Sequence, residues 1–322
     1  MPSLKLSDVR ASNAAWKPAY APVAIFVGGT SGIGKAVAEA FARATKGNAH
    51  IVLIGRNRTA AESILSKLPP PPKQSPNLTR EFLPCDLSRI PNVHEATAAL
   101  LQRFPQGINF LFLTAGAMSF SGLDLNEDGI DKQLALQYYS RWAFISDLLP
   151  ALRAAQAAGQ EARVSAIHTA GRGGPVDLND IGLVNTLTDL RLKTMGKLIS
   201  SLASYQDLMV ESFGERNSSI SFAHTFPGLV DTPLMKVSSS KIMRMLYPVR
   251  YLLFPPLWWA MSPEECGERQ LYGLLNAPAG ASRITSDGTD MGLNGQGDKT
   301  WAEAREKLWA HTEKVVGKGV SS

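Results

Sequence analysis

Residues 27–34 read VGGTSGIG, a loop in which Gly28, Gly32 and Gly34 stand at a fixed spacing. The apolar run 23–27 before it has the length of a strand, and a helical pattern begins near Gly32. Glycine permits a sharp turn and a close approach of backbone N–H groups, and a helix N-terminus offers unpaired donors. We therefore predict a diphosphate-binding loop, formed by Gly28, Thr30, Ser31, Gly32, Ile33 and Gly34. The alternative is a tight strand-to-helix turn without a ligand.

Positions after three further apolar runs fit the same ligand. Arg56 stands where many dinucleotide-binding proteins have an acidic residue for the ribose 2′-hydroxyl, and an arginine suits a 2′-phosphate instead. This favours NADP over NAD, although Arg56 would also fit a solvated loop. Asp86 is placed to accept a hydrogen bond from the adenine amine, and the small residues around Thr114 and Gly116 leave room for the cofactor over the strand ends.

The elements that must position these residues alternate along the chain. Strand-like apolar runs cover residues 23–27, 50–54, 81–84, 108–113, 163–168 and 219–226. Helical patterns lie between them over 32–45, 59–68, 93–104, 131–158 (one helix or two) and 187–213. This alternation predicts an α/β fold with a Rossmann-like, doubly wound parallel sheet. We expect an N-terminal extension over 1–20 and a single domain over 21–322.

Composition excludes several other classes of protein. The net charge of +5 across 322 residues is too small to indicate nucleic-acid binding, and no basic run with interleaved aromatics occurs. Cys85 and Cys266 stand far apart, and no His, Asp, Glu or Cys set has metal-ligand spacing, so neither a disulfide framework nor a metal site is expected. The N-terminal residues lack the apolar core of a signal peptide, which predicts a cytoplasmic protein.

At this point the chain resembles the short-chain dehydrogenase/reductase family over about residues 20–315. The family's glycine motif appears as VGGTSGIG, its NNAG as TAGA (114–117), and its PGxVxT as PGLVDT (227–232). YYSRW (138–142) and ISFAHTFPG (220–228) are most similar to divergent members among fungal natural-product reductases, and LWAHTEK (308–314) is similar to the closing helix of reductase-like members. The resemblance implies hydride transfer between a nicotinamide and a carbonyl or alcohol. It also adds four cofactor-binding residues: Pro227, Gly228, Val230 and Thr232.

The family's proton-transfer residues are not all present. The resemblance implies an Asn-Ser-Tyr-Lys set at the active site, but this chain contains no Tyr-x-x-x-Lys motif. The Asn position is Gln137 and the Ser position is His168. We predict catalytic roles for Gln137, for His168 as proton donor or orienting group, and for Tyr138 as a substitute phenol. The alternative for His168 is a hydrogen-bonded structural histidine. Lys197 is predicted to contact the cofactor, with a solvated helix lysine as the alternative.

The segment 233–262 is rich in Met, Leu, Tyr, Phe and Trp with basic residues between them. We expect a lid over a bulky apolar substrate, such as a secondary metabolite; packing on the domain and contact with a membrane surface are the second and third alternatives. By resemblance, pairing through the two long helices would give a homo-oligomer. The missing dyad leaves a second hypothesis, a non-redox catalyst such as an isomerase or cyclase, or a cofactor-binding regulator.

Overall fold

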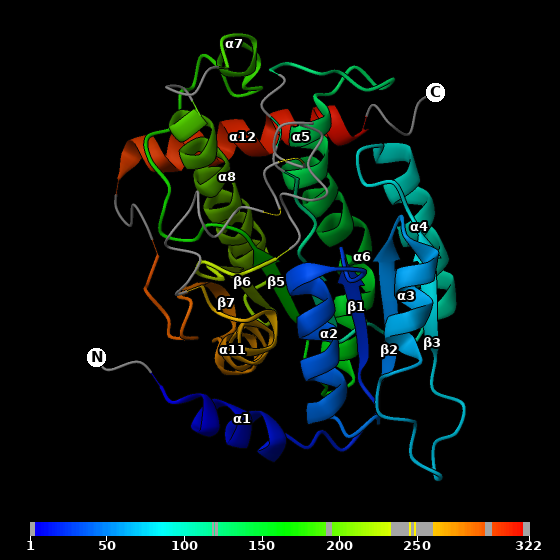
Figure 1. Cartoon of the computed structure of the whole chain (residues 1–322). Helices are drawn as coiled ribbons and strands as arrows, with labels where there is room; N and C mark the ends of the chain where they lie inside the picture. Colours follow the sequence, from blue (N-terminus) through cyan, green and yellow to red (C-terminus); the bar gives the residue numbers. More distant parts are fainter. Residues whose placement is uncertain are drawn as a thin grey trace.

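The computed structural model describes residues 4–117, 119, 122–190, 195–232, 245, 248, 260–293 and 298–317. Its centre is a seven-stranded parallel sheet in the order β3-β2-β1-β4-β5-β6-β7 (Figure 1). The strands are β1 (Val23–Val27), β2 (His50–Gly55), β3 (Arg80–Pro84), β4 (Phe110–Leu113), β5 (Arg163–Ile167), β6 (Ser221–Thr225) and β7 (Gly280–Ile284). The predicted Rossmann-like, doubly wound fold is confirmed. The seventh strand, β7, was not predicted from the sequence.

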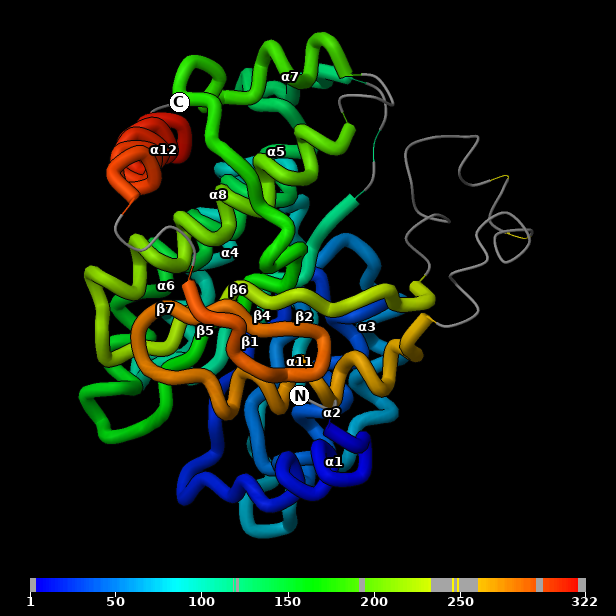
Figure 2. The backbone as a smooth tube through the Cα atoms, turned by 90° about the vertical axis from the view of Figure 1, so that its left-hand side faces the viewer, coloured from blue at the N-terminus to red at the C-terminus, as the bar shows by residue number. Residues whose placement is uncertain are grey.

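Helices cover both faces of the sheet (Figure 2). One face carries α2 (Gly32–Ala44), α3 (Arg58–Leu65) and α11 (Pro263–Asn276), and the other carries α4 (Ile90–Arg103), α6 (Ser140–Ala157) and α8 (Met195–Arg216). Because both faces are covered, the central strands are buried along their whole length and are apolar at successive positions, as in β1. The carboxyl ends of all the strands meet at one edge of the sheet, where open α/β sheets bind ligands.

The long helical region expected over 131–158 is a continuous run of three segments. It begins with α5 (Lys132–Leu134), passes through the π-helical η1 (Ala135–Tyr139) and continues as α6. Asp131 caps its start by accepting hydrogen bonds from the N–H groups of Gln133 and Leu134. A π-helical turn inserts an extra residue and is frequent at functional sites, and here it carries Gln137 and Tyr138.

The helix expected over 187–213 begins later than predicted. A separate short helix, α7 (Val184–Thr188), ends before Asp189, and α8 begins at Met195. Lys193, which stands four residues before Lys197, lies outside the described residues, as does most of the predicted lid at 233–262. What the structure describes of the lid's base is a short parallel pairing between Val230 and Met261. In the described part of the chain, no helix is both long and apolar enough to cross a membrane.

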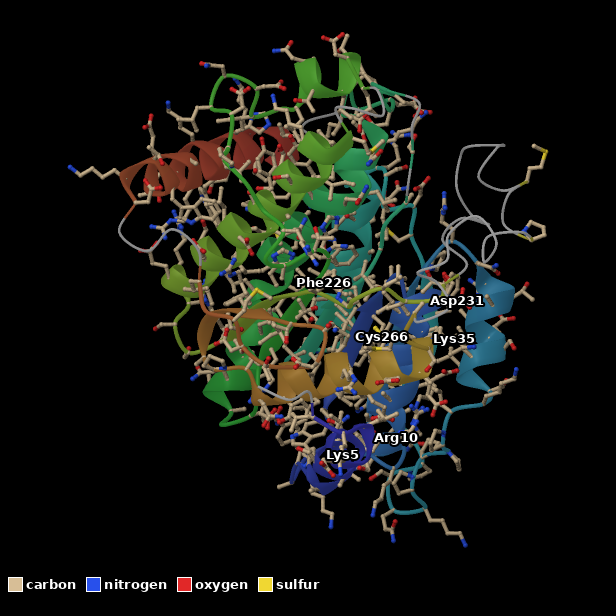
Figure 3. The ribbon with its side chains drawn as sticks, turned by 60° about the vertical axis from the view of Figure 1, so that its left-hand side comes forward. Lys5, Arg10, Lys35, Phe226, Asp231 and Cys266 are labelled. Carbon is tan, nitrogen blue, oxygen red and sulfur yellow. The ribbon has the colours of Figure 1, made fainter. Side chains whose placement is uncertain are left out.

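The predicted N-terminal extension forms a helix, α1 (Leu6–Ala15), that lies against α11 (Figure 3). Arg10 pairs with Glu264 at 2.8 Å, and the buried Asn13 side chain donates to Glu268 at 2.9 Å. Just beyond α1, Trp16 packs edge-on against Phe110 in the core beneath the sheet. These contacts make residues 6–16 part of the folded body.

The C-terminal helix α12 (Lys299–Gly317) lies across α8 and η1. Trp309 packs against Trp142 of α6 and Phe213 of α8, with ring centroids 5.2 and 4.9 Å apart. Trp301 donates to Glu211 of α8 at 2.8 Å. One of the two long helices through which pairing of two chains was expected, α8, is therefore packed against α12 of the same chain.

Candidate functional site

The glycine loop after β1 is packed so closely that side chains are excluded. Gly28 has a φ of +86°, and a Cβ atom there would lie 2.7 Å from the backbone nitrogen of Ala115. A Cβ at Gly34 would overlap the Gly28 carbonyl and the hydroxyl of Thr114. Glycine is needed at both positions, so the residues chosen from the spacing lie together as predicted.

The N-terminus of α2 behind this loop is free to bind an anion. The helix is preceded by Ser31, whose side chain makes no capping hydrogen bond, and no acidic residue lies in its first turn. Its first N–H groups are therefore available, with the positive end of the helix dipole, for a diphosphate. Ile33 packs into the core below and anchors the helix.

The segment after β4 forms the opposite wall. Thr114 donates from Oγ1 to the Val27 carbonyl at 2.9 Å, which ties this segment to β1. Gly116 is exposed, and a Cβ placed there would meet no atom within 4 Å among the described residues other than its chain neighbours. The described residues therefore leave room for a nicotinamide dinucleotide lying across the strand ends.

Arg56 follows β2 at the surface. Next to it, Asn57 caps α3 by accepting from the N–H of Ala60 at 2.9 Å, and Thr30 of the glycine loop lies against Gly55. Residues 55–58 include no acid, so the carboxylate that would select an unphosphorylated ribose is absent from the end of β2. Arg56 itself is exposed and directly follows the carboxyl end of β2.

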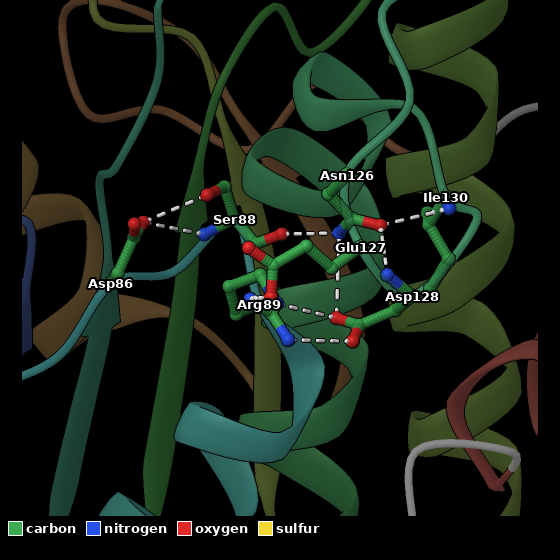
Figure 4. Close-up of polar contacts among 7 residues, drawn as sticks. All are labelled: Asp86, Ser88, Arg89, Asn126, Glu127, Asp128 and Ile130. Atoms are coloured by element: carbon green, nitrogen blue, oxygen red, sulfur yellow. Dashed lines mark hydrogen bonds and ion pairs between the residues drawn. The ribbon is translucent and has the colours of Figure 1, made fainter.

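Asp86, after β3, stands at the start of a polar network (Figure 4). Its Oδ1 accepts from the N–H and hydroxyl of Ser88, at 3.1 and 2.8 Å. Beyond it, Arg89 forms two hydrogen bonds to Asp128, and Asn126 donates to the Ser88 carbonyl at 2.6 Å. The network fastens the segment after β3 to the segment after β4 and fixes Asp86 at the predicted adenine end.

The PGLVDT segment after β6 returns to the glycine loop. Gly228 has a φ of +78°, and the side chain of Thr232 lies 3.6 Å from the position of a Cβ at Gly32. Val230 pairs with Met261, which holds the segment in place. Pro227 accepts a weak hydrogen bond from the Cys266 thiol of α11. The structure thus brings the predicted cofactor residues of β1 and β6 into contact.

Gln137, His168 and Thr169 form a hydrogen-bonded chain after β5. Gln137 donates from Nε2 to the Ala117 carbonyl at 3.0 Å, so its Oε1 accepts from His168 Nε2 at 3.0 Å. His168 Nδ1 must then accept from the Thr169 hydroxyl, 2.9 Å away. The network assigns a neutral imidazole with its proton on Nε2.

Buried ionisable side chains surround the hydrogen bonds of His168. Burial, followed by electrostatic interactions with Arg141 and His224, holds the pKa of His168 well below its usual value. The fully buried His224 bonds Asp207 at 2.6 Å, and burial lowers its pKa as well. His168 is therefore neutral at pH 7, and both of its ring nitrogens are occupied by protein groups. Orienting, rather than donating a proton, is the predicted role that fits this geometry.

The prediction of Tyr138 as a substitute phenol does not fit the structure. Its side chain is 2% exposed, and its hydroxyl bonds the Thr312 hydroxyl of α12 at 2.9 Å. Thr312 already donates to the Leu308 carbonyl, so Tyr138 is the donor of this bond. Burial raises its pKa well above the usual value. The π-helical turn directs Gln137 toward the sheet edge and Tyr138 into the core, where it packs against Tyr205.

Lys197, in the first turn of α8, is exposed and pairs with Asp177 at 3.3 Å. This contact joins the start of α8 to the loop after β5, and the contact of Lys197 with the cofactor stays a prediction. The residue that sequence reasoning missed is Arg141, which is 1% exposed and donates to the Ala115 carbonyl at 2.9 Å. The only available signal was a charged residue at the start of an apolar helix. No group of three possible metal ligands occurs among the described residues.

Comparison with known proteins agrees with this arrangement. The family model for short chain dehydrogenase matches residues 22–172. Oxidoreductase AN1596 of Emericella nidulans is 31% identical, over 98% of this chain and 99% of that protein. A solved 3-oxoacyl-(acyl-carrier-protein) reductase of Agrobacterium tumefaciens with NADP bound has a TM-score of 0.54 and 20% identity, covering 83% of this chain and 94% of that one.

A second solved structure, the MalC reductase/Diels-Alderase of Malbranchea aurantiaca, has a TM-score of 0.59 and 16% identity. It covers 83% of this chain and 95% of that one, and at these identities both structures show a shared fold. The similarity to the Emericella oxidoreductase extends over the full length of both proteins and indicates common ancestry, in addition to the shared fold. The chain therefore belongs to the short-chain dehydrogenase family and is an NAD(P)-dependent oxidoreductase.

Proposed function

We propose that the protein uses NADP(H) to interconvert a carbonyl and an alcohol on a bulky apolar substrate. The observation that carries this proposal is the cradle assembled from the ends of β1, β2, β4 and β6, with Arg56 where an acid would select NAD. A guanidinium is well suited to a 2′-phosphate, because its planar set of donors matches phosphate oxygens.

The bound nicotinamide would supply or accept the hydride, and the chain's own residues would orient the reactants. Gln137 holds His168 in its Nε2–H form, and His168 in turn accepts the Thr169 proton. The Thr169 oxygen is left with acceptor capacity. A substrate hydroxyl can therefore donate to Thr169, which favours the alcohol as the form that this chain orients. A missing proton donor is worth about 10²–10⁴-fold in rate, so it slows hydride transfer without abolishing it.

The apolar substrate class is supported by where large apolar side chains remain exposed. Leu125 follows β4, Val184 and Ile199 follow β5, and Leu229 follows β6, and all four are 42–52% exposed. They all lie in segments that follow strands whose carboxyl ends form one edge of the sheet. Exposed apolar side chains in such segments suit a bulky apolar ligand, and a secondary metabolite is one such ligand.

The first test is a fluorescence titration of the purified protein with NADPH and, separately, NADH. We expect NADPH to bind more tightly. A screen of apolar ketones and alcohols by absorbance at the reduced-nicotinamide band would follow. Binding of neither cofactor would contradict the proposal, and equal binding of both would remove the role of Arg56.

One observation favours the second candidate, a non-redox catalyst or cofactor-binding regulator. Among the described residues near the cradle, His168 has both nitrogens occupied and Tyr138 is buried, so neither predicted proton donor is free to act. The mass of the product separates the two functions. Redox turnover changes the substrate by two hydrogens, whereas an isomerase or cyclase leaves the mass unchanged.

The expected partners follow from the same surfaces. We propose a homo-oligomer paired through the two long helices; α12 packs on one of them, α8, and light scattering at micromolar concentration distinguishes the pair from a monomer. A peripheral membrane contact would require the exposed apolar side chains named above to bind lipid, which flotation with liposomes would detect. We place the activity in the cytoplasm, and a fluorescent fusion would check that location.

A further inference from the structure

Arg141 is a buried cation that the proposed chemistry has not yet used. Its side chain, at the start of α6, is 1% exposed. Its Nη2 donates to the Ala115 carbonyl at 2.9 Å, while its Nε and Nη1 have no hydrogen-bond partner among the described residues. Burial lowers the pKa of Arg141 to about 9, so the side chain still carries its charge at pH 7.

Arg141 and Gln137 act on the same segment. They stand four residues apart, which places them one turn apart on a helix and on a shared face. Gln137 donates to the Ala117 carbonyl and Arg141 to the Ala115 carbonyl. Two side chains of one helical run thus hold alternate carbonyls of the segment after β4.

The other side of this segment is held by the glycine loop. A Cβ at Gly28 would lie 2.7 Å from the Ala115 nitrogen, so the two backbones are in direct contact. Gly116 lies between the two anchored carbonyls, and no described residue beyond its chain neighbours comes within 4 Å of a Cβ placed there. The segment 115–117 is therefore clamped from the glycine loop and from η1 and α6, with its free surface toward the place of a cofactor.

Stability is a poor reason to keep such a residue. Removing a charge from water costs several kcal/mol, and replacing buried ionic groups by apolar ones of similar volume is often neutral or stabilising. A guanidinium with two unpartnered nitrogens recovers less of that cost than a fully bonded one. The one hydrogen bond that Arg141 makes within the described residues is to the cofactor-facing segment, which gives this cation a positional role.

We propose that Arg141 is a positioning residue that sets the level of segment 115–117, and through it the seat of the nicotinamide half of the cofactor. This inference rests on the proposed function, because it assumes that a nicotinamide dinucleotide occupies the cradle. Arg141 does not touch the cofactor itself. Its effect should fall on the nicotinamide half, while the adenosine half depends on the loop after β1 and on Arg56.

The test compares two ligands by isothermal titration: NADPH, and 2′-phospho-ADP-ribose, which lacks the nicotinamide. In Arg141→Met we expect the affinity for NADPH to fall about tenfold, the usual scale for one hydrogen bond from a charged donor. The affinity for 2′-phospho-ADP-ribose should change less than twofold. Arg141→Lys, which retains the charge and a donor, should recover part of the loss, and the emission maximum of bound NADPH should shift only in Arg141→Met.

Arg153→Met is the matched control. Arg153 lies on the same helix and bonds Asn217 at 2.6 Å, away from the segment after β4, so both ligands should bind this variant as they bind the wild type. Equal loss of both ligands in folded Arg141→Met, or no loss of either, would overturn the inference. Should Arg141→Met fail to fold, Arg141→Lys decides by the same comparison. Failure of the wild type to bind NADPH would instead contradict the proposed function, and the positional role with it.

Discussion

The cradle after β1 and the polar chain after β5 lie at the same edge of the sheet, yet they are made of different parts of the polypeptide. The cradle consists mostly of backbone: Gly28 and Gly34 press against the segment after β4, and the N-terminus of α2 is open. The polar chain consists of side chains, in which Gln137, His168 and Thr169 are bonded to one another.

This difference explains why one half of the site follows the family pattern and the other departs from it. The backbone cradle depends on Gly28 and Gly34, where any side chain would clash with neighbouring atoms. A side-chain network can exchange its members together, provided that every buried polar group finds a partner. In this protein Gln137 and His168 stand at the family's Asn and Ser positions, and they satisfy each other's hydrogen bonds together with Thr169. This network leaves no free proton donor.

The largest effect on the backbone cradle is expected from a substitution at Gly34. In Gly34→Ala the new methyl group would overlap the Gly28 carbonyl and the Thr114 hydroxyl. We expect the free energy of unfolding to fall by about 3 kcal/mol. NADPH affinity should fall by about 100-fold, an equivalent free energy. Urea unfolding and fluorescence titration measure the two effects.

The control for Gly34 is Gly196→Ala. Gly196 lies in the first turn of α8, and a Cβ there meets no atom of a neighbouring described residue within 4 Å, so this variant should be as stable as the wild type or slightly more so. Wild-type binding of NADPH by Gly34→Ala would mean that the cradle tolerates side chains and would end the contrast between the two halves.

A charge reversal at Arg56 tests the cofactor preference without disturbing the backbone. Arg56→Glu should weaken NADPH binding by about 30-fold, the scale of a charge-assisted phosphate contact, and should leave NADH binding unchanged or improved. Arg58→Glu is the control, because Arg58 lies against Phe82 and pairs with Glu62. Parallel losses for both cofactors would show that Arg56 contributes to the fold of the loop and not to selection.

The histidines of the polar side-chain network should make the stability of the protein depend on pH. The pKa of His168 and of His224 is lowered in the folded state, so below pH 6.5 the unfolded chain takes up protons that the folded chain does not. Stability contributed by these groups is therefore present at neutral pH and lost as pH falls, by up to about 1.4 kcal/mol per pH unit for each histidine. His168→Asn should remove one such slope in urea unfolding between pH 7.5 and 5.

Histidine NMR provides the sharper reading of the same effect. Both His168 and His224 should titrate below the usual histidine pKa, and His168 should still show the chemical shifts of a neutral imidazole where a free histidine is already protonated. His94 is the internal control: its hydrogen bond to Asp147 raises its pKa, so it should titrate above 6.5. A titration midpoint for His168 near 6.5 or higher would make it available as a general acid. The polar side chains after β5 would then include a proton donor, as the family's active site does.

The smallest effect is expected at Tyr138. Tyr138→Phe removes the hydrogen bond to Thr312 from a buried position and should lower the free energy of unfolding by about 1 kcal/mol. NADPH binding and any turnover should stay at wild-type levels, since the phenol faces α12 and not the cradle. A drop in turnover with unchanged stability would return Tyr138 to the site.

Much of this protein could be read from its residues alone. The glycine spacing, the apolar runs and PGLVDT predicted the doubly wound sheet and the cradle, because a backbone turn next to a buried strand leaves a local pattern. The same patterns did not predict α1 or β7, since neither carries a strong periodic apolar signal. β7 was found only in the structure, where it pairs with β6 at the edge of the sheet.

The roles of the polar side chains were decided by tertiary structure. Gln137 and Tyr138 are neighbours in sequence, yet η1 turns one toward His168 and the other into the core against α12. Nothing in the spacing shows that Arg141 is buried beneath the segment after β4. A hydrogen bond between residues far apart in the chain depends on how the helices pack on the sheet, so sequence determined the cradle and packing determined the chemistry beside it.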